Sequence, residues 1–186
     1  MKLSEIRKAN NEGGMMDPQK NSVMVNGTEF QLAGKTVSVG DKAPEFHATD
    51  MNMNPVDSKK FEGKVRIFLT LSSLDTPVCD TETRRFNAEA ANLSGELAVV
   101  TISMDLPFAQ KKWAENSQAK NILLISDYQD ASFGRSFGVL IEKQRLLART
   151  VFVVDRQGLV RYREIVPDIS QEPDYDSAVK AAKNLL

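Results

Sequence analysis

Cys79, the one cysteine in this chain of 186 residues, is the side chain best suited to act as a nucleophile. It lies three residues after Thr76 in the segment Thr76-Pro77-Val78-Cys79. Threonine is a favoured helix N-cap and proline a favoured first helical residue, so this spacing places the sulfur in the first turn of a helix. Backbone N–H groups in that turn lack helical partners and the helix dipole is positive there, which favours a thiolate. We predict a reactive thiol; the alternative is a buried cysteine that serves only as a small apolar side chain.

The scarcity of cysteine and histidine excludes several kinds of site. One cysteine cannot form a disulfide within the chain, and one histidine, His47, leaves too few ligands for a Cys/His zinc site. A cysteine hydrolase or acyltransferase would need a base beside Cys79, and His47 lies far from it along the chain. We expect His47 to be a surface or edge-strand residue.

Composition and charge indicate a soluble globular protein. Apolar residues make up 41% of the chain and charged residues 26%, and the formal net charge is −1, so the sequence does not call for a nucleic-acid partner. It contains no run of about 18 apolar residues, so we expect no membrane span. The first residues lack the apolar stretch of a secretory signal, and we expect a cytoplasmic protein. We interpret residues 1–21 as a flexible N-terminal arm and residues 22–186 as a single domain.

The elements that must position Cys79 follow from apolar periodicity and from turn residues. The dipeptide Asn26-Gly27 predicts a tight N-terminal β-hairpin, and residues 35–39 are a candidate for a further strand. Strands are predicted at 65–71, 97–103, 122–125, 151–154 and 160–165. Helices are predicted from 77 to a stop at Gly95, and at 107–117, 131–137 and 173–186.

The order of these elements predicts an α/β fold. The strands that alternate with helices should be parallel, and the last two, which flank the turn at 155–158, should form an antiparallel hairpin. The result is a mixed central sheet with helices on both faces and an added N-terminal β-hairpin. This is the thioredoxin-like layout, and it places the Cys79 helix directly after a buried strand.

The segment 72–87, SSLDTPVCDTETRRFN, resembles the active-site segment of the bacterial thiol peroxidases, a branch of the peroxiredoxin family. Further segments that agree with this family are GDKAPEF at 40–46, MDLPFAQ at 104–110, LARTVFVVD at 147–155 and EPDY at 172–175. The resemblance covers roughly residues 23–186. It implies the thioredoxin-like fold, a homodimer, and reduction of hydrogen peroxide and alkyl hydroperoxides without a metal or organic cofactor.

The resemblance also implies two partners for Cys79. Thr76 would offer its hydroxyl and backbone to the sulfur and to the incoming peroxide. Arg149 would hold the thiolate and stabilise charge on the leaving oxygen. Without the resemblance, the place of Arg149 in the sequence predicts a surface charge at the edge of a strand. Arg84 and Arg85 lie one to two helical turns beyond Cys79, and we expect them at the surface or in a dimer contact.

Two positions depart from the family pattern. Ser72 stands where the family has a proline that screens the cysteine pocket, and Ala114 stands where the family usually has a resolving cysteine. Without a second cysteine, a Cys79 sulfenic acid must be reduced by thioredoxin or another external thiol. A second interpretation stays open, in which the chain is a peroxidase-derived binding or redox-sensor module with little turnover.

Overall fold

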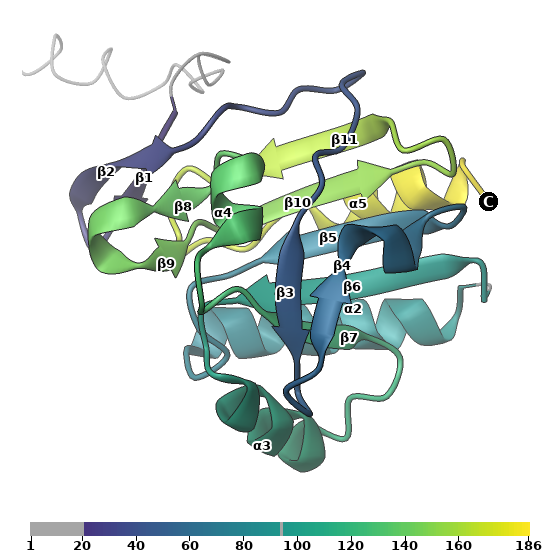
Figure 1. The fold of residues 1–186 in the computed structure, drawn as a ribbon, viewed down its shortest axis with the longest axis horizontal. Helices are drawn as coiled ribbons and strands as arrows, with labels where there is room; N and C mark the ends of the chain where they lie inside the picture. The colour runs from purple at the N-terminus through teal and green to yellow at the C-terminus, as the bar shows by residue number, and fades with distance from the viewer. Residues whose placement is uncertain (1–20, 94) are drawn as a thin grey trace, which may run out of the picture.

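A computed structural model describes residues 21–93 and 95–186 (Figure 1). Apart from Asn21, the arm predicted from the sequence lies outside the described residues.

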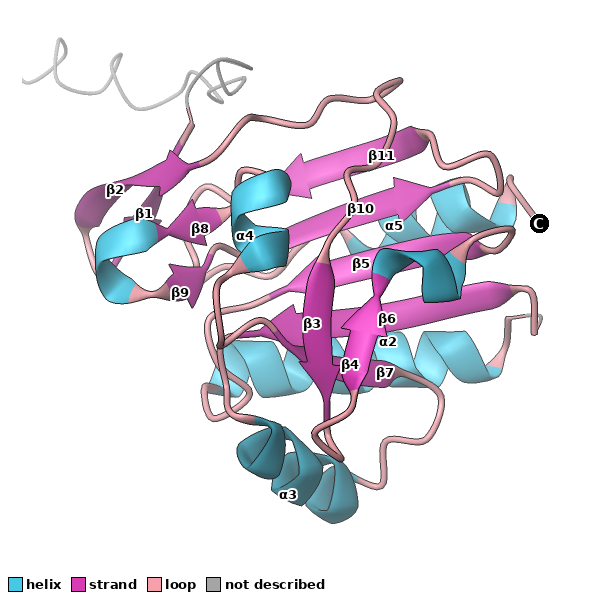
Figure 2. Ribbon diagram, viewed as in Figure 1, coloured by secondary structure: helices cyan, strands magenta, loops and turns pink. Residues whose placement is uncertain are grey.

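A seven-stranded mixed sheet forms the centre of the protein, with the order β11-β10-β5-β6-β7-β3-β4 (Figure 2). Its strands β5, β6 and β7 are parallel, and β10 and β11 are antiparallel, as predicted. All residues of β5 and β10 are buried, because both strands lie inside the sheet and are covered on both faces. The strands are β3 (His47–Asp50), β4 (Pro55–Asp57), β5 (Val65–Thr70), β6 (Leu97–Ser103), β7 (Leu123–Ser126), β10 (Thr150–Val154) and β11 (Val160–Ile165).

Helices cover both faces of this sheet, which confirms the predicted α/β layout. Side chains of β5 divide between two cores. Ile67 packs with α2 and α5, while Phe68 packs with α4 and the 3-10 helix η1 on the opposite face. None of the described helices is long and apolar enough to cross a membrane. The helices are η1 (Ser58–Phe61), α2 (Pro77–Ala91), α3 (Pro107–Ser117), α4 (Ser132–Ser136) and α5 (Tyr175–Lys183).

The predicted N-terminal hairpin is present and belongs to a second, smaller sheet. Asn26 and Gly27, between β1 and β2, have φ angles of 49° and 77°, which suit a tight hairpin turn. The sequence analysis missed β8 and β9, because strands of two residues carry no periodic pattern, and it also did not predict the short strands β3 and β4 of the central sheet. The sheet has the order β1-β2-β8-β9, with β1 (Ser22–Val25), β2 (Thr28–Ala33), β8 (Leu140–Ile141) and β9 (Leu146–Leu147); η2 (Glu142–Gln144) joins the last two.

Three expectations about element boundaries were wrong. Residues 35–39 form no strand, because Gly34, with a φ of 100°, turns the chain away from β2 against the backbone of α4. The helix that carries Cys79 ends at Ala91, before the expected stop at Gly95. The last helix begins only after Asp174, whose carboxylate caps it by accepting from the backbone N–H of Ser177 at 3.0 Å.

Candidate active site

Cys79 lies in the first turn of α2, where the sequence predicts it. Thr76 is the N-cap residue, with extended backbone angles, and Pro77 is the first helical residue. Cys79 is only 1% exposed and belongs to the core cluster between the sheet and α2 and α5. The sulfur therefore combines a helix N-terminus with an environment that excludes most water.

The loop that joins β5 to α2 is held by Asp105. Its carboxylate accepts hydrogen bonds from the Ser73 hydroxyl at 2.7 Å, the Leu74 backbone N–H at 2.8 Å and the Ser103 hydroxyl at 2.8 Å. Asp105 lies two residues after the end of β6, the parallel neighbour of β5, so the carboxyl ends of the two strands bring these groups together. These bonds fix the backbone just before the start of the Cys79 helix.

Arg149 reaches the sulfur from the residue before β10. Strand β10 is antiparallel to β5 with Thr150 opposite Thr70, so Arg149 lies beyond the end of β5, where the loop to α2 begins. Its Nη2 donates to Cys79 Sγ at 3.3 Å, and its Nε and Nη2 donate to the Ile169 carbonyl at 3.2 and 2.7 Å. Arg149 is 1% exposed. The structure thus joins two of the three predicted site residues, which lie 70 positions apart in the sequence.

Glu82 completes this buried group, and the sequence analysis did not select it. Its carboxylate forms an ion pair with Arg149 Nη1, and its other oxygen, Oε1, has no hydrogen-bond partner among the described residues. Burial raises the pKa of Glu82 from 4.5 to about 7, against the opposing effect of Arg149. Burial also acts to lower the pKa of Arg149, but its contacts with Glu82 and Cys79 raise it above its ordinary value.

A signal for Glu82 was available in the sequence. The buried face of α2 consists of residues 79, 82, 83 and 86, which is the spacing of one helix face. A glutamate on such a face, one turn from a cysteine, indicates a buried carboxylate that needs a cationic partner. The identity of that partner could not be read from the same pattern.

Thr76, the third predicted residue, lies outside the buried group. Its side chain is exposed, and its hydroxyl donates to the Ser73 carbonyl at 3.0 Å instead of capping the helix. No hydrogen bond joins Thr76 to the sulfur within the described part of the chain. The residue lines a pocket of about 520 Å³ between α2 and α3, which Trp113 and Lys112 also line.

Ser72, which replaces the family proline, is buried and points inward. Its hydroxyl donates to the Leu147 carbonyl at 3.3 Å, and Leu147 belongs to β9. The serine thus ties the loop before Cys79 to the smaller sheet.

Helix α3 is fastened to α2 beside Ala114. Trp113 Nε1 donates to the Asp80 carboxylate at 2.8 Å, and Arg84 Nε donates to the same carboxylate at 2.9 Å. The Arg84 guanidinium also lies over the Trp113 ring, 5.5 Å from its centre. Arg84 and Arg85 are both exposed, which confirms the expected surface position.

His47 makes its contacts away from this site. It is the exposed first residue of β3, and its ring bonds Asp130 at 2.6 Å and Ser132 at 3.2 Å. The surface position is confirmed, although β3 lies between β7 and β4 and is not an edge strand. The ring is not placed to act as a base for Cys79. Over residues 21–93 and 95–186, no three His, Cys, Asp or Glu side chains gather as metal ligands.

The chain is similar in sequence to proteins of one known family. The Redoxin family profile matches residues 38–179. A thiol peroxidase from Halalkalibacterium halodurans is 46% identical over 165 residues, which cover 89% of this chain and 99% of that protein. A thiol peroxidase from Listeria innocua is 47% identical over 152 residues, which cover 82% of this chain and 92% of that protein.

A solved structure gives the same result for the fold. The peroxiredoxin-like protein from Aquifex aeolicus superposes with a TM-score of 0.83 at 37% identity, over 89% of this chain and 98% of that one. In sequence and in fold, over most of its length, the chain belongs to the Redoxin family, within which it groups with the thiol peroxidases.

Proposed function

We propose that this protein is a thiol-dependent peroxidase that reduces hydrogen peroxide and alkyl hydroperoxides through Cys79. The observation that carries the proposal is the 3.3 Å contact between Arg149 Nη2 and Cys79 Sγ at the start of α2. A guanidinium at this distance can donate a hydrogen bond to the sulfur and stabilise the negative charge that moves to the peroxide during the attack. The thiol peroxidases among its relatives support the same assignment.

The proposed reaction is attack of the Cys79 thiolate on one oxygen of the peroxide, in line with the O–O bond. An S–O bond forms as the O–O bond breaks, the sulfur is oxidised to a sulfenic acid, and the leaving oxygen takes a proton to become water or an alcohol. Arg149 stabilises the negative charge that grows on the leaving oxygen. Thr76 already donates its hydroxyl proton to Ser73, so its oxygen is suited to accept a hydrogen bond from the peroxide O–H.

Stopped-flow mixing of the reduced protein with hydrogen peroxide and with cumene hydroperoxide tests this function. We expect one fast turnover, with the mass of one added oxygen on Cys79, followed by continued turnover only when an external thiol is supplied. The Cys79→Ser variant is the blank. A reaction no faster than that of free cysteine would contradict the proposal, and a fast reaction that no thiol can recycle would favour the redox-sensor interpretation.

We also propose that an external thiol, such as thioredoxin, reduces oxidised Cys79. The chain has one cysteine, so its sulfenic acid has no thiol partner of its own. A free, unpaired cysteine also suits the reducing cytoplasm, where we place the protein.

Ala114→Cys is expected to raise steady-state turnover with thioredoxin and thioredoxin reductase by about threefold or more, because a disulfide gives thioredoxin a bond that it can attack. The measurement is NADPH consumption. Bridging needs Cα atoms within about 7 Å, a separation that two different helices do not normally offer unless one of them moves. Adding Trp113→Phe removes the hydrogen bond to Asp80 and should increase turnover further. Equal turnover with and without the new cysteine would show that position 114 does not resolve Cys79.

We propose that residues 22–186 act as one domain. The N-terminal hairpin is not a separate unit, because β2 pairs with β8 near the active-site strands. The smaller sheet also shares a core cluster with two residues of the larger sheet region. These are Ala148, two residues before β10, and Ile165, the last residue of β11.

We also propose that the protein forms a homodimer and that the start of α3 lies in the dimer interface. Leu106 and Phe108 are large apolar residues that are 52% and 66% exposed, and such groups mark interaction surfaces. Phe108→Asp is therefore expected to shift the mass found by light scattering at micromolar concentration from dimer to monomer. Lys111→Glu, an exposed change on the same helix, is the control. A monomeric wild-type protein would contradict this part of the proposal.

A further inference from the structure

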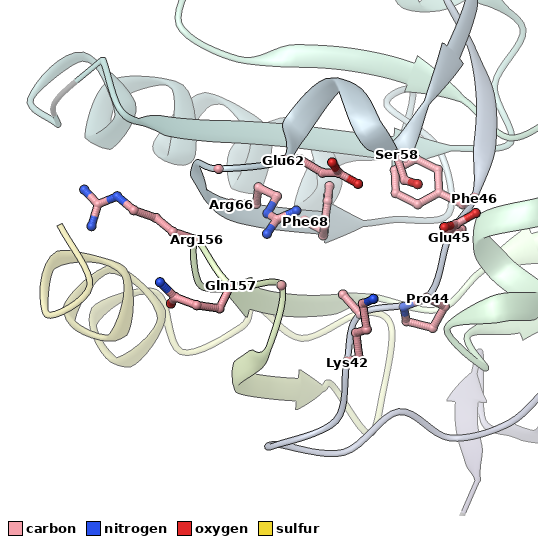
Figure 3. Close-up of a pocket in the computed structure, with 13 residues that line it drawn as sticks. Lys42, Pro44, Glu45, Phe46, Ser58, Glu62, Arg66, Phe68, Arg156 and Gln157 are labelled. Atoms are coloured by element: carbon pink, nitrogen blue, oxygen red, sulfur yellow. The ribbon is translucent and has the colours of Figure 1, made fainter.

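A pocket of about 370 Å³ lies at the opposite end of β5 from Cys79 (Figure 3). Arg66, the second residue of β5, lines this pocket, and the loop between β10 and β11 closes one side of it. The volume lies within the range of small-molecule sites, about 300–1,000 Å³. None of its lining residues belongs to the Cys79 site.

Arg66 is a buried cation without an anionic hydrogen-bond partner in the described structure. It is 5% exposed, and the one hydrogen bond that its guanidinium makes to the described residues runs from Nη2 to the backbone carbonyl of Asp155 at 2.6 Å. The Asp155 carboxylate is engaged elsewhere, with Arg161 Nε at 2.6 Å and the Leu159 backbone N–H at 2.8 Å. The Arg66 Nε is buried and has no partner among the described residues. Burial lowers the pKa of Arg66, and the nearby charges of Asp155 and Glu62 offset this effect only in part. A bound anion would compensate the buried charge further.

The wall beside this guanidinium is apolar. Phe46 and Phe68 are 3% and 2% exposed, and their rings meet edge to face with centres 5.5 Å apart. Figure 3 shows the Phe68 ring next to the Arg66 side chain. The lining of the pocket therefore places a cation beside the edges of two aromatic rings.

The rest of the lining carries charges of both signs. The strand-like segment 41–43 is bonded to the β10–β11 region, since the Ala43 N–H donates to the Gly158 carbonyl at 2.8 Å and the Val160 N–H donates to the Asp41 carbonyl at 2.9 Å. This pairing places exposed Lys42 at the pocket as a second cation. Glu45 and Glu62 also line it, and their negative charge would repel a doubly charged anion more than a singly charged one.

We propose that this pocket binds a small organic monocarboxylate, with the carboxylate on Arg66 and the apolar body of the ligand against Phe46 and Phe68. The planar guanidinium fork matches the two oxygens of a carboxylate. The aromatic wall favours a ligand with an apolar body over an inorganic anion. Lys42 adds attraction at the rim.

Calorimetric titration of the reduced protein with benzoate tests the site. Benzoate should bind saturably, while benzamide, which has the same shape without the charge, should bind at least about tenfold more weakly. Inorganic phosphate should show no saturable binding, because the two glutamates disfavour a second negative charge. The readout is binding alone, so it is independent of peroxide turnover by Cys79.

Arg66→Met should weaken benzoate binding about tenfold or more, because it removes the cation and keeps the length of the side chain. Removing a buried charge that its neighbours compensate only in part should leave the thermal midpoint unchanged or higher. Arg163→Lys is the matched control. Arg163 is another strand arginine whose buried Nε has no hydrogen-bond partner among the described residues, but it does not line this pocket. Its variant should therefore bind benzoate as the wild type does.

Three results would overturn the proposal. They are equal binding of benzoate and benzamide, binding of phosphate as tight as that of benzoate, and undiminished benzoate binding after substitution of Arg66. If Arg66→Met fails to fold, Arg66→Lys decides the question. That variant keeps the charge but loses the fork, and it should still weaken benzoate about threefold or more.

Discussion

Arg149→Met is expected to slow the reaction of Cys79 with peroxide about 100-fold to 1,000-fold, the usual cost of removing one donor aimed at developing charge. In the wild-type protein Arg149 Nη2 lies 3.3 Å from the sulfur, and the residue is almost completely buried. Methionine removes this donor and its charge. Glu82 is left without its cation, but a carboxylate with a raised pKa can take up a proton and become neutral.

The measurement is the second-order rate constant of a single turnover in the stopped-flow instrument. Alkylation of Cys79 by iodoacetamide at pH 7 should also become slower, because the thiolate loses its cation. Arg84→Met is the matched control. Arg84 lies on α2, the helix that carries Cys79, but it bonds Asp80 at the surface. If Arg149→Met leaves both the peroxide rate and the alkylation rate unchanged, Arg149 has no role in the reaction.

Glu82→Gln is expected to change how the free energy of unfolding depends on pH. The folded protein raises the pKa of Glu82 from 4.5 to about 7, so between these values the folded state holds a proton that the unfolded state has lost. The stability contributed by this group is complete below pH 4.5 and is lost as the pH rises through about 7. Glutamine does not titrate. The wild-type free energy of unfolding, relative to that of the variant, should therefore fall by about 3 kcal/mol from pH 4.5 to pH 7.5.

Urea unfolding of both proteins across this pH range gives the difference. Glu96→Gln is the control, because Glu96 pairs with Arg156 at the surface with its side chain 69% exposed. A difference that rises with pH would show that attraction to Arg149 outweighs the burial of Glu82. Glutamine still accepts a hydrogen bond from Arg149, so the peroxide rate should fall only about tenfold, less than after loss of the guanidinium itself.

The position of Cys79 was determined by the sequence in its immediate neighbourhood. A helix start depends on a few consecutive residues, and Thr76 and Pro77 specify it by their backbone preferences alone. The same local rule did not predict the threonine hydroxyl. That hydroxyl bonds the carbonyl of Ser73, three residues earlier, so a second local hydrogen bond competes with capping of the helix.

The buried strands of the central sheet could also be predicted from the sequence, because burial on two faces demands the nearly continuous apolar runs seen in β5 and β10. The short strands β8 and β9 could not be predicted, since they pair with each other over only two residues each and join a sheet through β2, which lies more than a hundred residues earlier in the chain. Their local sequence carries no preference strong enough to mark them.

Only the tertiary structure decided what surrounds the sulfur. Arg149 meets Cys79 because β10 is antiparallel to β5 in one particular register, and a shift by one residue would turn its side chain to the other face of the sheet. Glu82 was visible as a charge on an apolar helix face, but its partner follows from the same register. In the same way, Arg66 lacks an anionic hydrogen-bond partner because the Asp155 carboxylate bonds Arg161 and leaves only its backbone carbonyl for Arg66. The sequence by itself determined where the thiol stands on its helix, because that depends on neighbouring residues; the charges around it were decided by contacts between strands, which no local pattern specifies.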